Sequence, residues 1–175
     1  MTNPKYHIQL QTDADIAAIE NLLDAAFGID RHTKTSYRLR EGEKPLPGLS
    51  FIARDNDGHL IAAISFWQIH IGKNGPDAIL LGPLAVMPGQ QSNGLGQALM
   101  AHGIKAAEKD GHQLVILVGD APYYAKAGFK KVPEDQMIMP GPNDPDRLLY
   151  LELQSGALAS AKGLIRSPTR FRLAN

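Results

Sequence analysis

The chain has 175 residues, of which 43% are hydrophobic and 21% charged, a balance that predicts one folded globular domain. Eighteen basic side chains cancel eighteen acidic ones, so no net field draws the chain to nucleic acid or to an anionic membrane, and we expect neither as a partner. The absence of cysteine excludes disulfides, a thiolate nucleophile and cysteine-bound zinc, and we expect no metal.

The N-terminal part of the chain is predicted to hold a strand, a helix and a flap. Residues Tyr6–Gln11 alternate as in a short strand. Apolar residues then recur at helical spacing between residues 16 and 27, and Gly28 ends this helix. The weaker, polar helical stretch Arg31–Arg40 lies in the turn-rich segment Gly28–Gly48, which we interpret as a surface flap.

Three strand-like runs after the flap predict an antiparallel meander. They cover Leu49–Arg54, His59–Ile71 and Ala78–Met87 and are separated by turn residues. The third run is apolar throughout, as expected of a central strand that is buried on both faces. It contains Gly82-Pro83, and because proline has no N–H to donate, strand pairing must break, bulge or splay there.

The C-terminal half adds a crossover. A helix at Gly94–Asp110 leads to the buried strand Leu114–Val118, which should lie parallel to the third strand of the meander. The later elements are a short helix at Pro122–Ala127 and a strand that begins at Phe129. A proline-rich loop at Pro133–Pro145 and a last strand at Leu148–Leu153 follow. Together they predict an α/β (α+β) fold with helices on both faces of a mixed, mostly antiparallel sheet of about six or seven strands, splayed near Gly82-Pro83.

A glycine-bearing loop, Gln91–Gly96, joins the buried strand to the following helix. Backbone N–H groups at such a helix start can bind phosphate, and Gly94 and Gly96 remove side chains that would keep it away. The loop contains no lysine followed by serine or threonine, so it is not a P-loop. It is not a dinucleotide fingerprint either, since Leu99 stands where the third glycine is needed.

Two spaced motifs resemble the conserved region of the GNAT superfamily of acetyl-coenzyme A-dependent N-acetyltransferases. The first is Gln-x-x-Gly-x-Gly at 91–96, and the second is Tyr-x-x-x-Gly-Phe at 124–129. They occur in the family's order, with the strand 114–118 between them. Gly-Pro-Leu-Ala-Val at 82–86 and Val-Gly-Asp at 118–120 look like a bacterial branch of predicted N-acetyltransferases. The similarity is strong over about residues 81–130 and looser over 5–153.

The resemblance implies a GNAT-like fold, acetyl-CoA as cofactor and a role for each matching residue. The pantetheine arm would run along the backbone of Leu84, Ala85 and Val86. The pyrophosphate would be held by Gln91, Ser92, Asn93, Gly94, Leu95 and Gly96, with Gln97 as an outer contact. The far side would be lined by Asp120, Tyr123 and Lys126, and Tyr124 would be the acid that protonates the departing sulfur.

Each of three assignments has a structural alternative. Tyr123 can be an aromatic packing residue at the edge of the core. Asp120 can cap the short helix that follows it, and Lys126 can be a solvated surface charge. The phosphate loop alone could also be a plain capping turn, and only its combination with the second motif favours a coenzyme A site.

The predicted reaction is transfer of an acetyl group from acetyl-CoA to a primary amine by direct attack in a ternary complex, since no cysteine can form an acyl-enzyme. The alternative is a non-catalytic acyl-CoA-binding regulatory module. The general base is open between His70, Asp77 and an ordered water, with Glu41 and Glu43 on the flap as further carboxylates.

The acceptor is not identified by the sequence; a small molecule and a peptide amine both fit. We expect it to be shaped by the flap and by the loop Val132–Asp146, whose Glu134 and Asp135 suit an amine cation. The segment 155–175 has four basic and no acidic residues, and we interpret it as a basic tail after an acetyltransferase domain at 1–154. That tail packs on its own subunit or on a neighbour, so a homodimer is left open. The polar start of the chain and its short apolar runs predict a cytoplasmic protein.

Overall fold

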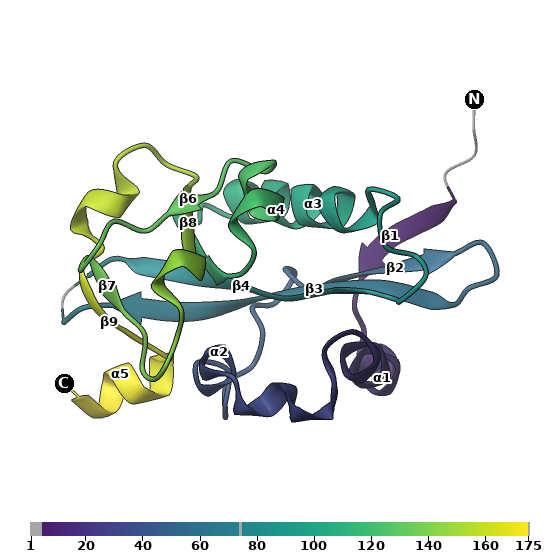
Figure 1. Cartoon of the computed structure of the whole chain (residues 1–175), viewed down its shortest axis with the longest axis horizontal. Coiled ribbons are helices and arrows are strands. Elements are labelled where there is room, and N and C mark those ends of the chain that lie inside the picture. The colour runs from purple at the N-terminus through teal and green to yellow at the C-terminus, as the bar shows by residue number, and fades with distance from the viewer. Residues whose placement is uncertain (1–4, 74, 175) are drawn as a thin grey trace.

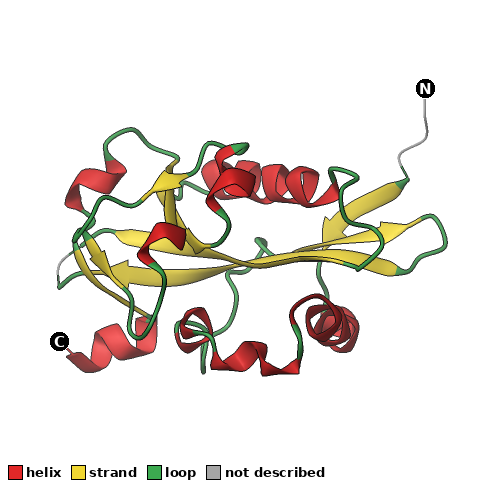
Figure 2. Cartoon of the chain, viewed as in Figure 1, coloured by secondary structure: helices red, strands yellow, loops and turns green. Residues whose placement is uncertain are grey.

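The computed structural model describes residues 5–73 and 75–174. A sheet of nine strands crosses the molecule, with α3 and α4 on one face and α1, α2 and α5 on the other (Figures 1 and 2). The strands are β1 (Tyr6–Leu10), β2 (Phe51–Asp55), β3 (Leu60–Ile71), β4 (Asp77–Val86), β5 (Leu114–Val118), β6 (Lys130–Lys131), β7 (Met137–Ile138), β8 (Leu148–Glu152) and β9 (Gly163–Arg166). The helices are α1 (Ile16–Phe27), α2 (Thr35–Arg38), α3 (Leu95–Lys109), α4 (Ala121–Ala125) and α5 (Pro168–Ala174).

The strand order β1-β2-β3-β4-β5-β8-β6 confirms a mixed, mostly antiparallel sheet. Only β4 and β5 pair in parallel along this path, as the crossover through α3 requires. The sheet is larger than expected because the short strands β7 and β9 were not predicted. Strand β9 pairs with β3, and β7 pairs with β9.

The sheet splays at the expected place. In the β3–β4 ladder, Ile64 faces Leu84 and Phe66 faces Leu81, so Gly82 and Pro83 together oppose one residue and form a bulge. The peptide between Gly82 and Pro83 is cis. Strands β4 and β5 are paired only from Ile79 to Leu80 on the β4 side, so the edge of β4 that faces β5 is left open beyond Leu80.

Helix α1 covers the end of β4 that follows the bulge. A capping box between Thr12 and Asp15 precedes the helix, and Gly28, at a φ of 85°, ends it. The buried side chains of α1, Ile19, Leu22 and Leu23, pack in a cluster that contains Ala85 of β4. This packing fixes one face of β4 beside the splay.

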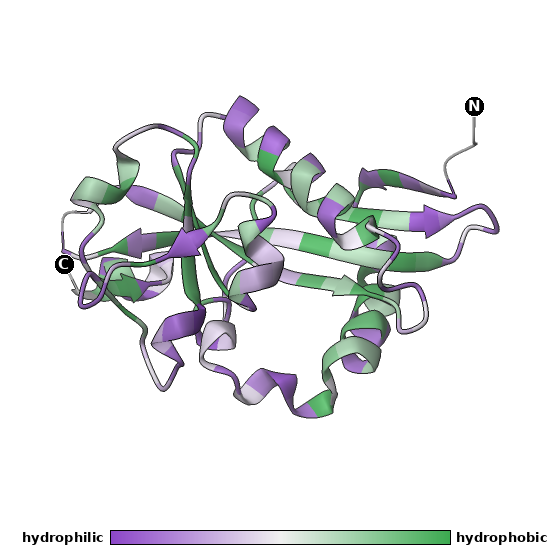
Figure 3. Cartoon of the chain, turned by 45° about the horizontal axis from the view of Figure 1, so that its top comes forward, coloured by the Kyte–Doolittle hydropathy of each residue, from purple (hydrophilic) through white to green (hydrophobic). Residues whose placement is uncertain are grey.

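Helix α3 packs on the opposite face. Leu99 and Met100 are fully buried in the largest core cluster, and Gly103 lies so close to Phe66 that a Cβ would come within 2.6 Å of the ring. The alternation of hydrophobic and hydrophilic residues along this helix is visible in Figure 3. The first turn of α3 is thereby held next to the last residues of β4.

Two segments differ from their expected surface positions. The flap Gly28–Gly48 is partly internal: Arg31 is 2% exposed and Leu39 is 1% exposed. In the C-terminal segment, Ala161 and Ile165 are fully buried, and β9 forms hydrogen bonds with β3. The segment therefore packs on its own subunit, while the domain boundary at residue 154 stays a prediction. No helix in the described part of the chain is long and apolar enough to cross a membrane.

Candidate functional site

A cavity of about 520 Å³ lies where β4 and β5 separate. We call it the splay cavity. Its walls include the β4 residues Leu80–Leu84, Val118 at the end of β5 with the following Gly119 and Asp120, and both tyrosines of α4. The cavity therefore brings together three segments that the sequence assigned to one site. Tyr124, Tyr123, Asp120 and Leu84 all line it.

Tyr124 is held from several sides. Its ring contacts Phe129 edge-on at 5.9 Å between centroids and Tyr123 edge-on at 5.1 Å. Burial, assisted by the nearby Tyr123 and Asp120, raises the pKa of the Tyr124 phenol to about 12 against a lowering contribution from Arg147. The phenol is thus a proton donor throughout the physiological range.

The start of α4 is tied to α3. The Asp120 carboxylate accepts a hydrogen bond from the Tyr123 N–H at 3.1 Å, so Asp120 does cap this helix. The Gln97 side-chain amide of α3 donates to the Tyr123 carbonyl at 2.9 Å. The first bond stabilises the start of α4, and the second ties α4, and with it Tyr124, to α3.

The predicted phosphate loop precedes α3 as an exposed turn. Gly94 is the N-cap residue of α3 with a left-handed φ of 76°, and Ser92 is also left-handed at 71°. The Gln91 amide donates to the Val86 carbonyl at 3.3 Å, which ties the turn back to β4. No side chain caps the α3 N-terminus, whose first N–H groups have no intrahelical acceptor.

These features suit a pyrophosphate at the start of α3. The Leu95 side chain is buried in the core, so only its backbone can face a ligand. At Gly96 an added Cβ would overlap the Tyr123 hydroxyl and lie 3.4 Å from Val86 Cγ2, so glycine is required for the present packing. Uncapped N–H groups next to small residues are the arrangement by which a helix start binds a phosphate.

The three residues at the end of β4 differ in orientation. Leu84 and Val86 pack toward the α3 side of the sheet, whereas the Ala85 side chain is buried on the α1 side. One edge of this segment pairs with β3, from Ile64↔Leu84 to Ala62↔Val86. The other edge faces the splay, so backbone groups of β4 are available to a ligand there.

Several residues named from the sequence lie away from the splay cavity. Lys126 ends α4 as an exposed residue and lines none of the cavities described here. His70 and Asp77 pair with each other, Nδ1 to Oδ1 at 2.9 Å, and His70 stacks on Phe171. Asp77 begins β4, six residues or roughly 20 Å of extended chain before Pro83. The His70–Asp77 pair is therefore remote from the splay.

The acidic residues that the sequence suggested on the flap and in the loop 132–146 also lie apart from one another. Glu43 accepts a hydrogen bond from the Thr169 N–H at 2.8 Å and so fastens the flap to α5. Glu134 and Asp135 line a different hollow, together with Glu152 and Lys162. Of the carboxylates on the flap and in the loop 132–146 that the sequence suggested, Glu41 alone lines the large cavity under the flap, which Asp13 and Glu20 also line. The loop 132–146 reaches the splay cavity through other residues, Met139, Pro142, Asn143 and Asp144.

The cavity under the flap has a volume of about 1290 Å³, and we call it the flap cavity. It shares part of its wall with the splay cavity. The shared residues are Arg31, Tyr37, Arg40 and Pro83. Sequence reasoning missed these flap residues because their stretch has weak helical periodicity; the clustering of two arginines with a tyrosine was the available signal. It also missed Arg147, which lines the splay cavity.

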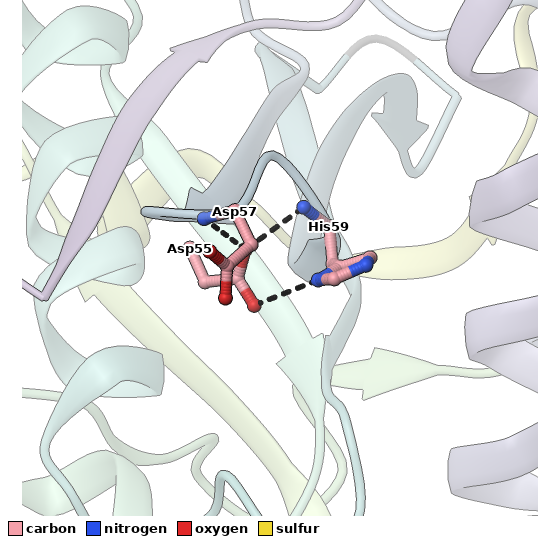
Figure 4. A group of neighbouring side chains, drawn as sticks. All are labelled: Asp55, Asp57 and His59. Atoms are coloured by element: carbon pink, nitrogen blue, oxygen red, sulfur yellow. Dashed lines mark hydrogen bonds and ion pairs between the residues drawn. The ribbon is translucent and has the colours of Figure 1, made fainter.

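A separate acidic group lies at the β2–β3 hairpin and consists of Asp55, Asp57 and His59 (Figure 4). Asp55 Oδ1 accepts from the N–H groups of Asp57 at 3.0 Å and His59 at 2.8 Å, and its Oδ2 lies 3.2 Å from His59 Nδ1. These bonds form the turn itself. The group lies outside the cavities and carries no functional assignment.

Comparison with known proteins adds sequence relatives. Residues 16–129 match the model of the acetyltransferase (GNAT) family. The uncharacterized N-acetyltransferase YhbS of Escherichia coli K12 is 24% identical over 164 residues, which cover 94% of this chain and 97% of YhbS. The uncharacterized N-acetyltransferase YjhQ of the same strain is 33% identical over 134 residues, which cover 75% of this chain and 72% of YjhQ.

Solved structures are similar over nearly the whole chain. E. coli YhbS in complex with CoA matches with a TM-score of 0.80 and 25% identity, covering 98% of this chain and 96% of that one. A Brucella melitensis GNAT acetyltransferase in complex with acetyl-CoA matches with a TM-score of 0.61 and 26% identity, covering 87% and 97%.

Proposed function

Since the chain belongs to the acetyltransferase (GNAT) family, we propose that it transfers an acetyl group from acetyl-CoA to a primary amine by direct attack in a ternary complex. The observation that carries the proposal is the open edge of β4 next to Tyr124. An acyl donor placed along that edge has backbone polar groups on one side and a protonated phenol on the other. The CoA and acetyl-CoA complexes of the two similar structures support this choice of donor.

We assign donor binding to backbone more than to side chains. The N–H groups of Leu95, Gly96 and Gln97 would hold the pyrophosphate, with Gln91 to Gly94 shaping the turn. The backbone of Leu84 to Val86 would bind the pantetheine arm, as an added strand would. Acetyl-CoA supplies an activated thioester carbonyl. Asp120 and Tyr123 act mainly by positioning α4.

Tyr124 is assigned as the general acid. Its hydroxyl would donate the proton that neutralises the leaving thiolate, and its raised pKa keeps that proton in place at neutral pH. For the base, His70 is disfavoured by its distance from the splay and by its pairing with Asp77. The two acidic residues of the splay cavity, Asp120 and Asp144, each accept a backbone N–H as helix caps. We therefore propose that an ordered water removes the amine proton.

The test is a titration with acetyl-CoA, followed by a thiol-release assay with a panel of amines. Acetyl-CoA should raise the melting temperature, because a ligand that binds only the folded state stabilises it, whereas NADH and ATP should do much less. An equal shift with NADH or ATP would contradict the donor assignment. Tight acetyl-CoA binding with no thiol release for any amine would favour the alternative, a non-catalytic acyl-CoA-binding regulatory module.

A further inference from the structure

The wall shared by the two cavities contains a cation, Arg40, that forms no ion pair with any residue that the structure describes. The Arg40 guanidinium stacks on the Tyr37 ring, with Cζ 3.8 Å from the centroid, and lies 5.8 Å from the Trp67 ring. Its Nε is buried and has no hydrogen-bond partner. Among the ion pairs of the described residues, none includes Arg40.

The neighbouring Arg31, in contrast, forms ion pairs and hydrogen bonds. Arg31 pairs with Glu20 and, at 2.9 Å, with Asp24, and it donates to the Tyr37 hydroxyl at 3.0 Å. Although burial alone would lower the pKa of Arg31, these bonds raise it. Glu20 and Asp24 are thus already engaged by Arg31.

Arg40 shows the opposite balance. Burial lowers the pKa of its guanidinium, and the favourable effects of Tyr37 and Glu20 do not restore it. A partly buried charge without an ion pair costs stability, and a ligand that supplies the opposite charge would remove this cost. The planar guanidinium is suited to a carboxylate or phosphate, which can accept two hydrogen bonds from it.

The position of Arg40 relates this charge to the reaction. Arg40 lines both the flap cavity and the splay cavity, and Pro83 of the β4 bulge belongs to the same shared wall. A molecule in the flap cavity whose anionic end contacts Arg40 can therefore extend past Pro83 toward the open edge of β4. The flap cavity, at about 1290 Å³, is larger than the roughly 300–1,000 Å³ of a usual ligand pocket and so has room for a small molecule.

We propose that the amine acceptor is a small molecule that also carries a carboxylate or phosphate group, and that this group binds the Arg40 guanidinium in the flap cavity. The proposal rests on the proposed acetyl transfer and narrows its substrate class. An acceptor of this kind differs from a polyamine or a protein lysine, which would bring only positive charge to Arg40.

The experiment compares matched amines that differ only in the anionic group. Ornithine against putrescine tests a carboxylate, and phosphoethanolamine against ethanolamine tests a phosphate; a wider panel of amino acids and phosphorylated amines is screened beside them. Thermal shift gives binding without turnover, and thiol release gives kcat/KM. We expect at least one amine with an anionic group to be preferred by about tenfold or more over its counterpart without that group, as the loss of charged hydrogen bonds implies.

The matching variant is Arg40→Gln, and the control is Arg170→Gln, which makes the same charge change in exposed α5. Arg40→Gln should abolish the preference for the anionic amine, chiefly by raising its KM, and should leave the affinity for acetyl-CoA unchanged. Arg170→Gln should keep both the preference and the affinity of the wild type. Arg40→Met provides a second reading: because it removes an unpaired charge while keeping apolar bulk, it should leave the melting temperature unchanged or higher. A purely structural arginine would instead destabilise the fold when replaced.

The proposal is overturned if no amine with an anionic group shifts the melting temperature in an Arg40-dependent way, or if the counterparts without that group are bound and acetylated equally well. Either result leaves acetyl transfer standing, provided that acetyl-CoA binds and some amine releases thiol. Failure of acetyl-CoA itself to bind would instead remove the proposed function, while Arg40-dependent binding of an anionic amine would still support the anion site.

Discussion

The Tyr124 ring lies against the backbone of Gly119, so closely that a Cβ on Gly119 would come within 2.9 Å of Tyr124 Cδ2 and closer still to Cε2. Gly119 does not have a left-handed φ, so alanine is compatible with its backbone. The glycine is needed for space alone, and it fixes where the phenol of Tyr124 lies.

Gly119→Ala should therefore displace the Tyr124 ring and lower turnover by about tenfold, since general acid catalysis depends on hydroxyl placement. The measurement is thiol release with an accepted amine. The same substitution in a Tyr124→Phe background should cost little, because the hydroxyl is already gone. Equal losses in both backgrounds would mean that Gly119 acts on something other than Tyr124.

Tyr124→Phe should reduce turnover by at least about tenfold while acetyl-CoA affinity is retained, because it removes one hydroxyl and keeps the ring packing. The pH profile supplies an independent check. An acid with a pKa of about 12 is protonated below that value and loses its proton only as the pH rises through it. The wild-type profile should thus show no alkaline fall assignable to Tyr124 below about pH 11.

Gly96→Val should weaken acetyl-CoA binding, because the valine side chain at the start of α3 would displace the Tyr123 side chain of α4. Gly94→Ala is the comparison: it meets no atom within 4 Å, but its φ of 76° makes any side chain strained, at a cost of about 1 kcal/mol of stability. Calorimetric titration and thermal unfolding separate the two effects. Normal binding by Gly96→Val would reduce the loop to a helix cap.

Asp15→Asn should lower stability by roughly 2 kcal/mol or more at neutral pH, since Asp15 is 4% exposed and bonds Thr12 and Arg54. The hydrogen bonds from Thr12 and the Arg54 charge, opposed by burial, lower the pKa of Asp15. The stabilisation is therefore present above the ordinary carboxyl pKa of about 4 and disappears as the pH falls through the lower folded value. Denaturant unfolding at several pH values tests this, with exposed Asp57→Asn as control.

Ile165→Ala should destabilise the protein by about 2–4 kcal/mol, because Ile165 is fully buried where β9 joins the sheet. Leu173→Ala, at an 83% exposed position in α5, should have almost no effect. Similar small effects for both would show that the C-terminal segment is a detachable tail and not part of the folded core.

The sequence alone determined the parts of this protein that depend on local pattern. Hydrophobic periodicity located α1, α3 and the central strands to within one or two residues, and Gly82-Pro83 marked the splay because proline cannot donate to a ladder. The loop 91–96 and Tyr124 allowed the cofactor end of the site to be predicted for the same reason: both motifs are short and continuous in the chain.

The proposed acceptor site depends on the tertiary structure alone. Arg40 and Pro83 share a wall across a separation of more than forty residues in the chain, and no local pattern predicts that meeting. The same holds for β9: the sequence predicted a basic tail after residue 154, whereas β9 in this segment pairs with β3 and belongs to the sheet. Likewise His70 could be judged as a base only after its pairing with Asp77 was known. Contacts between distant segments depend on how the whole core packs, and this is information that residue spacing does not contain.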